Sequence, residues 1–222
     1  MKTRGTVSFD IIGTCFSLDL PRTRLVDLGA PAHALQLWFA QTLRDAFALS
    51  HAGGYRPLKE VLEAELPRTL KMIGVEASSG ELSRVVRSFT ELEPQPGALE
   101  SFRLLTEAGW KLVALSNGSE DSTRKLLERA GALQHFTDIL SCDAARKTKP
   151  HPDVYNLAKQ GAEGDVWMVA VHAWDIVGAA RAGLRTAFIT QEEKDYLSIY
   201  PQPEVVVSNL VEAANKIVEG YQ

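Results

Sequence analysis

The carboxylate of Asp10 is the first group in the chain whose position suggests chemistry. It lies near the end of the segment from Thr6 to Ile12 (TVSFDII), which has the composition of a buried strand and is broken by Gly13. A carboxylate at the carboxyl end of a parallel strand can attack an electrophile and form a covalent ester. A lone aspartate at this place could equally be a structural group that is hydrogen-bonded to the following turn. Asp10 alone therefore leaves both interpretations open.

Further polar groups follow three later apolar segments. They are a hydroxyl with an amide, a lysine with a tyrosine, and a histidine with a second carboxylate: Ser116, Asn117, Lys149, Tyr155, His172 and Asp175. If the segments form one parallel sheet, these groups converge on its carboxyl edge. Such a sheet has little structural need for so many polar groups at one edge. The combination favours a shared catalytic cleft with Asp10 as its nucleophile.

The apolar segments also predict the fold that positions these groups. They recur, with helical patterns between most of them, at Lys111 to Leu115, Asp138 to Cys142, Val166 to Val171, Thr186 to Ile189 and Val205 to Val207. This alternation indicates an α/β fold with a parallel sheet.

Residues 16–95 carry no strand signal. Apolar residues recur there at helical spacing, first around Trp38 and Phe39 and later from Leu58 to Leu70. The segment from Glu93 to Gly97 (EPQPG) interrupts the helical period just before the α/β pattern resumes. We therefore expect a core of residues 1–15 and 96–222, with residues 16–95 inserted after the first strand as an all-helical cap.

Charge and composition limit the class of partner. The 222 residues carry a net charge of −4, which gives no basic field for nucleic acid or an anionic membrane, and no apolar stretch approaches a membrane span. Cys15 and Cys142 are too few for a disulfide framework, so we expect buried free thiols and a cytoplasmic location. The expected partners are a small molecule and water, together with a second copy of the chain if an apolar helix face stays exposed.

Four motifs give the chain a resemblance to a known family. The sequences FDIIGT, LSNG, KPHPDVY and HAWD occur in the order and approximate spacing of the haloacid dehalogenase superfamily, over almost the whole chain. The resemblance implies a Rossmann-like core and assigns four roles: a nucleophile at Asp10, a substrate-holding pair at Ser116 and Asn117, a charge-balancing lysine at Lys149, and an acidic fourth-motif residue at Asp175.

The residue two positions after Asp10 separates the branches of this superfamily. Phosphatases carry a second aspartate there, which transfers the proton of the leaving alcohol, whereas this chain has Ile12. The fourth motif also offers only Asp175 as a clear carboxylate for magnesium, so a magnesium-dependent phosphatase is disfavoured. The helical cap and the HAWD sequence instead resemble the L-2-haloacid dehalogenase branch, which works without a metal ion or another cofactor.

Resemblance to that branch implies displacement at carbon. Asp10 would attack C2 of a small 2-substituted carboxylic acid, and water would hydrolyse the ester to give a 2-hydroxy acid. The binding residues that it implies are Ser116, Thr14 and the backbone amides of Ile11 and Ile12. Lys149 would keep Asp10 ionised with help from Tyr155, and Asp175 would place or activate water.

Two residues of the fourth motif each have two interpretations. His172 either contacts the hydrolytic water or is a hydrogen-bonded core residue. Trp174 either forms a wall of the substrate pocket or packs a helix against the sheet, and core packing is the interpretation that we prefer.

One position departs from the branch. Its members usually place an arginine on the first cap helix to stabilise the departing halide, and alignment through Leu37 and Trp38 puts Phe39 there. Phe39 lies on the apolar stripe of its helix, as cap core or as part of the pocket. Arg44 is five residues further on, roughly 140° around the helix, and does not replace the missing charge.

The missing arginine leaves alternatives to halide release open. Dehalogenation of a 2-haloacid is the main hypothesis. A related hydrolase that displaces another leaving group, such as the nitrogen of a strained ring, is the alternative. A binding protein without catalysis is a third, against which the presence of Asp10, Ser116, Lys149 and Asp175 argues.

Overall fold

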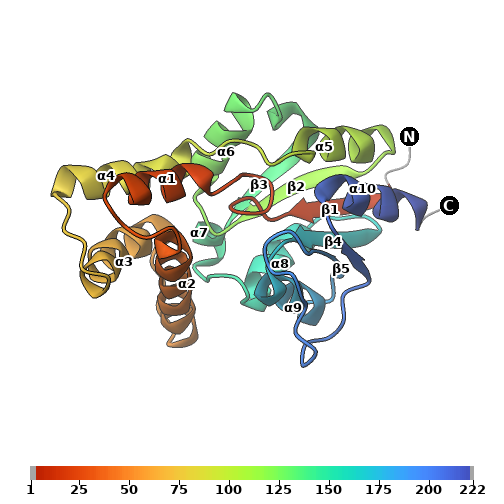
Figure 1. Cartoon of the computed structure of the whole chain (residues 1–222). Helices are drawn as coiled ribbons and strands as arrows, with labels where there is room; N and C mark the ends of the chain where they lie inside the picture. Colours follow the sequence, from red (N-terminus) through yellow and green to blue (C-terminus); the bar gives the residue numbers. More distant parts are fainter. Residues whose placement is uncertain (1–3, 221–222) are drawn as a thin grey trace.

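The computed structural model describes residues 4–220, and over these residues a parallel sheet forms the core of the molecule. Its strands lie in the order β3-β2-β1-β4-β5-β6, with parallel pairing throughout, so β1 is central (Figure 1). The bounds are β1 (Gly5–Phe9), β2 (Lys111–Ser116), β3 (Phe136–Ser141), β4 (Asp165–Ala170), β5 (Arg185–Ile189) and β6 (Val205–Val207). The predicted α/β fold with a parallel sheet is confirmed.

Helices cover both faces of the sheet. One face carries α5 (Ala98–Glu107), α6 (Glu120–Arg129) and α10 (Leu210–Glu219), and the other carries α7 (Cys142–Ala145), α8 (Pro152–Lys159) and α9 (Ala173–Arg181). Successive side chains of a strand point to opposite faces, so both faces of each central strand must be apolar. In β4, Trp167 and Val169 join the first of these cores, and Met168 joins the second.

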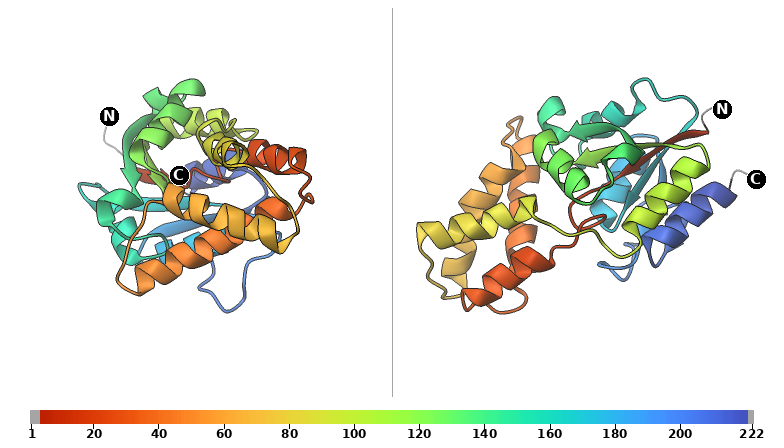
Figure 2. Two further views of the ribbon diagram at one scale, coloured as in Figure 1. Left: turned by 90° about the vertical axis from the view of Figure 1, so that its left-hand side faces the viewer. Right: turned by 90° about the horizontal axis from the view of Figure 1, so that it is seen from above.

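Four helices between β1 and α5 form the predicted helical cap at one end of the core (Figure 2). They are α1 (Asp19–Asp27), α2 (Ala34–His51), α3 (Leu58–Met72) and α4 (Ser79–Arg87), followed by the short 3₁₀ turn η1 (Ser88–Thr90). The apolar faces of these helices enclose a core of their own, in which the indole nitrogen of Trp38 donates to the carbonyl of Leu62. At the start of α4, Ser78 and Glu81 form a capping box.

The two connections between cap and core run side by side. The amide of Ser17 donates to the carbonyl of Glu93, and the amide of Gln95 donates to the carbonyl of Cys15, each at 2.8 Å. The chain therefore leaves the core and returns to it at one place. A domain division after residue 15 and before residue 96 remains our proposal.

The first strand is shorter than its apolar segment suggests, because it ends at Phe9 and not at Ile12. Beyond Phe9 the chain turns back on itself, and the carbonyl of Ile11 accepts from the amides of Cys15 and Phe16. Gly13 adopts φ +89°, a left-handed conformation that suits glycine. The turn leaves Asp10 as the first residue after the strand, with its amide still donating to the carbonyl of Val169 in β4 at 3.0 Å.

Two predictions from composition can be compared with the described residues. Between residues 4 and 220 no helix is both long enough and apolar enough to cross a membrane. Cys15 and Cys142 are both buried and unpaired, as expected.

Candidate active site

The strand order places the candidate nucleophile at a natural crevice. From β1 the chain adds β2 and then β3 on one side, and it returns to add β4 on the other side. Connections that leave in opposite directions open a crevice at the carboxyl ends of the two strands, where parallel α/β proteins bind ligands. Asp10 follows β1, Ser116 ends β2 and His172 follows β4. The sheet thus brings three predicted site residues to one edge.

Lys149 joins the two candidate carboxylates. Its Nζ atom donates to Oδ1 of Asp10 at 3.1 Å and to Oδ2 of Asp175 at 2.9 Å, and the side chain is fully buried. Burial alone lowers the pKa of Lys149, but the two carboxylates outweigh that effect and raise it. The charged lysine thus forms an ion pair with the carboxylate that would act as the nucleophile.

Thr14 holds the other oxygen of Asp10. Its hydroxyl donates to Oδ2 of Asp10 at 2.6 Å and accepts from the amide of Val171 at 3.2 Å. We expected Thr14 to contact the substrate, but its hydroxyl is occupied by the nucleophile and by the end of β4. The geometry makes it a positioning residue for Asp10.

Tyr155 acts on Lys149 through Asp175. Its hydroxyl donates to Oδ1 of Asp175 at 2.6 Å, and burial raises the pKa of that carboxyl. Both oxygens of Asp175 are therefore hydrogen-bonded to protein groups, and the residue is completely buried. Gly178 permits this packing, since a Cβ atom there would lie 2.6 Å from the Tyr155 hydroxyl oxygen.

The side chains of Ser116 and Asn117 differ in which hydrogen-bonding groups remain available to a ligand. Oγ of Ser116 accepts from the amide of Gly118, so its own proton remains available to another acceptor. The side-chain oxygen of Asn117 accepts from the amide of Lys149 at 3.1 Å and from the thiol of Cys142. Asn117 therefore anchors the segment that carries the lysine.

Backbone donors next to the nucleophile are unoccupied. Within residues 4–220, the amides of Ile11 and Ile12 have no hydrogen-bond acceptor. Unpaired amides beside a buried carboxylate form a site for an anion. These are the amides that we expected to bind a substrate carboxylate.

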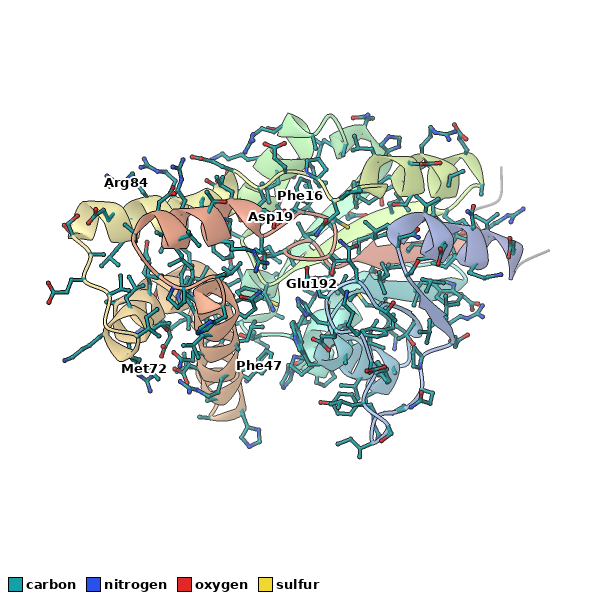
Figure 3. All side chains as sticks on the ribbon, viewed as in Figure 1. Phe16, Asp19, Phe47, Met72, Arg84 and Glu192 are labelled. Atoms are coloured by element: carbon teal, nitrogen blue, oxygen red, sulfur yellow. The ribbon has the colours of Figure 1, made fainter. Side chains whose placement is uncertain are left out.

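A cavity of about 1000 Å³ lies between cap and core, next to these groups. The cap contributes Phe39 and Phe47, and the core contributes Gly13, His172 and Trp174. Figure 3 shows Phe47 on the side of α2 that faces the core. Asp10 is only 4% exposed and is not itself part of the cavity wall, which reaches the Asp10 loop at Gly13.

Trp174, which we expected to pack a helix against the sheet, both lines the cavity and packs against the apolar core of the cap. Its indole stacks on the ring of His172, with centroids 5.4 Å apart and planes 15° apart, and contacts Phe47 at 5.2 Å. The tryptophan is free to do this because it lies at the start of α9, where the side chain projects beyond the sheet edge toward the cap.

His172 is held by a residue that the sequence did not reveal. Its Nδ1 atom lies 3.1 Å from Oε1 of Glu193, whose other oxygen accepts from the amide of Ala173 at 3.0 Å. Nε2 of His172 is buried and has no hydrogen-bond partner in the described chain. Glu193 lies between β5 and β6, in a segment without a motif or a periodic pattern, so no signal pointed to it.

Phe39 fulfils both of the roles we considered. It is 9% exposed, stacks on Phe89 with centroids 6.1 Å apart, and lies 6.4 Å from the ring of His172. Arg44 also lines the cavity, but its guanidinium pairs with Asp45 and Glu65.

A family model that describes haloacid dehalogenase-like hydrolases matches residues 6–183. The chain belongs to this family. The superfamily membership expected from the four motifs is confirmed, and the protein is a hydrolase. The aspartate, the lysine and the second carboxylate that the motifs place along the sequence meet in one buried cluster.

Individual relatives of this hydrolase cover most of its length. Haloacetate dehalogenase H-2 of Moraxella sp. (strain B) is 26% identical over 200 residues, which is 86% of this chain and 88% of the relative. The (S)-2-haloacid dehalogenase of Pseudomonas sp. (strain YL) is 27% identical over 209 residues, covering 92% and 90%. The solved structure of L-2-haloacid dehalogenase from Xanthobacter autotrophicus superposes with a TM-score of 0.86 at 24% identity, covering 97% and 98%, and has the same fold.

The donor set of this hydrolase does not fit magnesium. All four oxygens of Asp10 and Asp175 are occupied by Lys149, Thr14 and Tyr155, and Ile12 supplies no oxygen. In the described part of the chain, no three histidine, cysteine, aspartate or glutamate side chains are grouped so that they could hold a metal ion.

Proposed function

We propose that this hydrolase displaces a leaving group from C2 of a small 2-substituted carboxylic acid through an ester at Asp10, with a 2-haloacid as the main substrate class. The observation that carries the proposal is the setting of Asp10. Lys149 and Thr14 hold its two oxygens at the strand-order crevice, and Ile12 stands where a phosphatase needs a proton-transferring group. Relatives of similar length, one named as a haloacetate dehalogenase and one as an (S)-2-haloacid dehalogenase, support the substrate class.

In the first step, Asp10 is the nucleophile. The unpaired amides of Ile11 and Ile12, together with the Ser116 hydroxyl, bind the substrate carboxylate and fix C2 near Asp10. An oxygen of Asp10 attacks C2 from the side opposite the leaving group, so the configuration inverts. The product of this step is an alkyl ester of Asp10.

In the second step, water attacks the carbonyl carbon of the Asp10 ester. The Lys149 ammonium, 3.1 Å from Oδ1 of Asp10, stabilises the negative charge that develops on that oxygen. Asp175 contributes by holding Lys149, since its own oxygens are engaged by Lys149 and Tyr155. Collapse of the intermediate regenerates Asp10 and releases a 2-hydroxy acid.

A leaving group other than halide is the second candidate. Phe39 contributes no charge or hydrogen-bond donor to the cavity wall that faces His172, and Arg44 is paired with carboxylates. Removing one preorganised donor to a developing anion costs roughly a hundredfold to a thousandfold in rate. A leaving group that takes a proton from the protein would not need such a charge.

The test is a single turnover in heavy-oxygen water with each enantiomer of 2-chloropropionate. One heavy oxygen should enter Asp10, and the hydroxyl oxygen of the lactate should remain light, as measured by mass spectrometry of the peptide and the product. Heavy oxygen in the product and none in Asp10 would show direct attack by water. Asp10→Asn should abolish turnover, whereas the exposed control Asp121→Asn should keep it.

Two further proposals concern the setting of the protein. We propose a cytoplasmic location, supported by two buried thiols that stay unpaired. We also propose a homodimer as the working form, and light scattering at micromolar protein concentration tests it. A monomer mass at all concentrations would contradict the dimer.

A further inference from the structure

The imidazole of His172 is built into the cavity wall in one orientation. Nδ1 faces Glu193 at 3.1 Å, while Nε2 is buried and unpartnered. A buried polar atom without a partner costs free energy, so its retention calls for an explanation. Because Nδ1 is engaged by a carboxylate, Nε2 is the ring atom left to meet a ligand.

Glu193 is itself fixed. One oxygen meets His172, and the other accepts from the amide of Ala173 at the start of α9. Burial raises the pKa of Glu193, but the hydrogen bonds from His172 and Ala173 outweigh that effect and lower it. Burial lowers the pKa of His172, and the bond to Glu193 with the nearby carboxylate of Asp10 raises it above its ordinary value. A charged imidazole is therefore accessible near neutral pH.

Three neighbours surround the imidazole of His172. A Cβ atom at Gly13 would lie 3.2 Å from Nε2, so the ring approaches the nucleophile loop at a residue without a side chain. Trp174 stacks on one side of the imidazole, and Phe39 faces it from the cap. Nε2 therefore lies beside Gly13, three residues after Asp10, and both Gly13 and His172 line the cavity.

We propose that His172, positioned by Glu193, is the proton donor for the leaving group and the proton acceptor for the hydrolytic water. This inference rests on the proposed function, because it requires the ester at Asp10. The preferred substrate is then a small 2-carboxylate whose leaving atom becomes strongly basic as its bond breaks, such as the oxygen or the unprotonated nitrogen of a strained ring.

The proton balance closes over the two steps. Asp10 forms a bond to C2, the C2–O or C2–N bond breaks with its electron pair on the ring atom, and that atom takes the proton from Nε2. His172 is then neutral. When water attacks the ester carbonyl, Nε2 accepts one proton of that water. The bond between the carbonyl carbon and the ester oxygen then breaks, the second proton of the water goes to the oxygen of the departing 2-hydroxy acid, Asp10 is left as a carboxylate, and the imidazolium is restored.

Halide and ring substrates separate the two roles of His172. A bromide ion leaves without a proton, so ester formation from 2-bromopropionate does not need the imidazole. Hydrolysis of that ester still needs a base. With oxirane-2-carboxylate both steps need His172, because an alkoxide does not leave unprotonated.

The experiment measures the Asp10 ester by mass spectrometry after rapid quenching, with 2-bromopropionate, oxirane-2-carboxylate and aziridine-2-carboxylate. In His172→Gln we expect ester formation from the ring acids to fall by about a hundredfold or more. Ester formation from 2-bromopropionate should stay within about threefold of wild type, and the ester should accumulate because its hydrolysis is slow. Circular dichroism and thermal unfolding confirm that each variant is folded.

Glu193→Gln tests the positioning residue, with its neighbour Glu192→Gln as the matched control that also lines the cavity. The wild-type rate of ring opening should fall as the pH rises through the pKa of His172. The pH at which this fall in rate occurs should be lower in Glu193→Gln and unchanged in Glu192→Gln. An unchanged pH profile in Glu193→Gln would overturn the pairing.

The remaining outcomes are distinguishable. His172→Gln could slow ester formation equally for the bromide and the ring substrates, or it could leave every step unchanged. Either result would overturn the role of His172 while leaving the ester mechanism intact. Ester formation by wild type from 2-bromopropionate but never from a ring acid would overturn the substrate class. An enzyme that never forms an ester with any of the three acids would overturn the proposed function itself.

Discussion

The rings of Phe39 and His172 lie 6.4 Å apart, one supplied by the cap and the other by the core, and both line the same cavity. In the L-2-haloacid dehalogenase branch that the chain resembles, this cap position usually carries an arginine. Here it is the apolar Phe39, which faces the imidazole of His172. At this place the imidazole can assist a leaving group, whereas Phe39 offers neither a charge nor a hydrogen-bond donor. This relationship suggests the first prediction.

Phe39→Arg should increase halide release from 2-chloropropionate in a single turnover, on the order of a hundredfold, because it restores a charged donor opposite the nucleophile. The same change should lower the free energy of unfolding by about 1 to 3 kcal/mol, since it removes the stack on Phe89 and places a charge in a largely apolar wall. Phe39→Leu is the apolar control and should not speed halide release. A folded Phe39→Arg protein with unchanged rate would show that charge at this position is irrelevant.

Lys149→Met should abolish turnover and lower the free energy of unfolding by about 3 to 5 kcal/mol. The variant leaves the buried carboxylates of Asp10 and Asp175 without their shared cation. Urea unfolding monitored by tryptophan fluorescence measures the change. Lys59→Met, on the exposed surface of α3, should alter stability by less than about 0.5 kcal/mol. Wild-type stability in Lys149→Met would mean that the cluster is not held together by the lysine.

Gly178→Ala should disturb the site through Tyr155, which is hydrogen-bonded to Asp175. A Cβ atom there would lie 2.5 Å from Cβ of Pro150 and 2.6 Å from the Tyr155 hydroxyl oxygen, so Tyr155 has to move away from Asp175. We expect a loss of about 1 to 3 kcal/mol in stability and a drop in the turnover rate with little change in KM. Gly80→Ala in α4 is the matched control, where a Cβ atom meets only the end of Arg84 and should stabilise by about 0.5 to 1 kcal/mol.

The His172 and Glu193 pair should stabilise the fold in a defined pH window. The raised pKa of His172 contributes stability below its ordinary value of 6.5, and this is lost as the pH rises through the folded pKa. The lowered pKa of Glu193 contributes stability above its ordinary value of 4.5, and this is lost as the pH falls through the folded pKa. The stability difference between wild type and His172→Gln should therefore be largest between pH 4.5 and 6.5. Urea unfolding at a series of pH values measures it, and a flat difference would contradict the pairing.

Both thiols should resist alkylation in the native protein. Burial raises the pKa of Cys15 well above its ordinary value and raises that of Cys142 to about 12. Few thiolates therefore form at pH 8, and the reagent has no path to them. Iodoacetamide should label both residues in 6 M urea and neither within the same time in buffer, as counted by mass spectrometry. Rapid native labelling would show that the fold opens locally around β1 or α7.

The sheet was predictable because its four inner strands, β1, β2, β4 and β5, are mostly buried and form continuous apolar runs. Strand ends were less predictable. The run that begins at Thr6 continues to Ile12, but the strand stops at Phe9, where the turn that carries Asp10 begins. An apolar run marks burial, and Ile11 is as buried in that turn as it would be in a strand.

The residues of the cluster around Asp10 were predictable from the sequence, but the hydrogen bonds between them were less so. From the motifs we expected Tyr155 to position Lys149 directly, whereas the Tyr155 hydroxyl donates its hydrogen bond to Asp175. Glu193 and Gly178 could not be found, because each matters only through a residue brought to it by the fold. In the sequence, Glu193 is one acidic residue among several, and Gly178 is a weak position in a helix.

The paired connections at Cys15 and Gln95 also bear on how this architecture can change over evolution. Since the chain departs and returns across two backbone hydrogen bonds, the register of every core strand is independent of what lies between them. Helices can be lengthened or replaced in that interval without changing the strand pairing around Asp10, as long as the contact of Ser50 with the Thr148 amide beside Lys149 is kept. The cap wall of the cavity and the bond-breaking groups of the core are thus carried by separate stretches of one polypeptide, and the wall can be altered while the chemistry is kept.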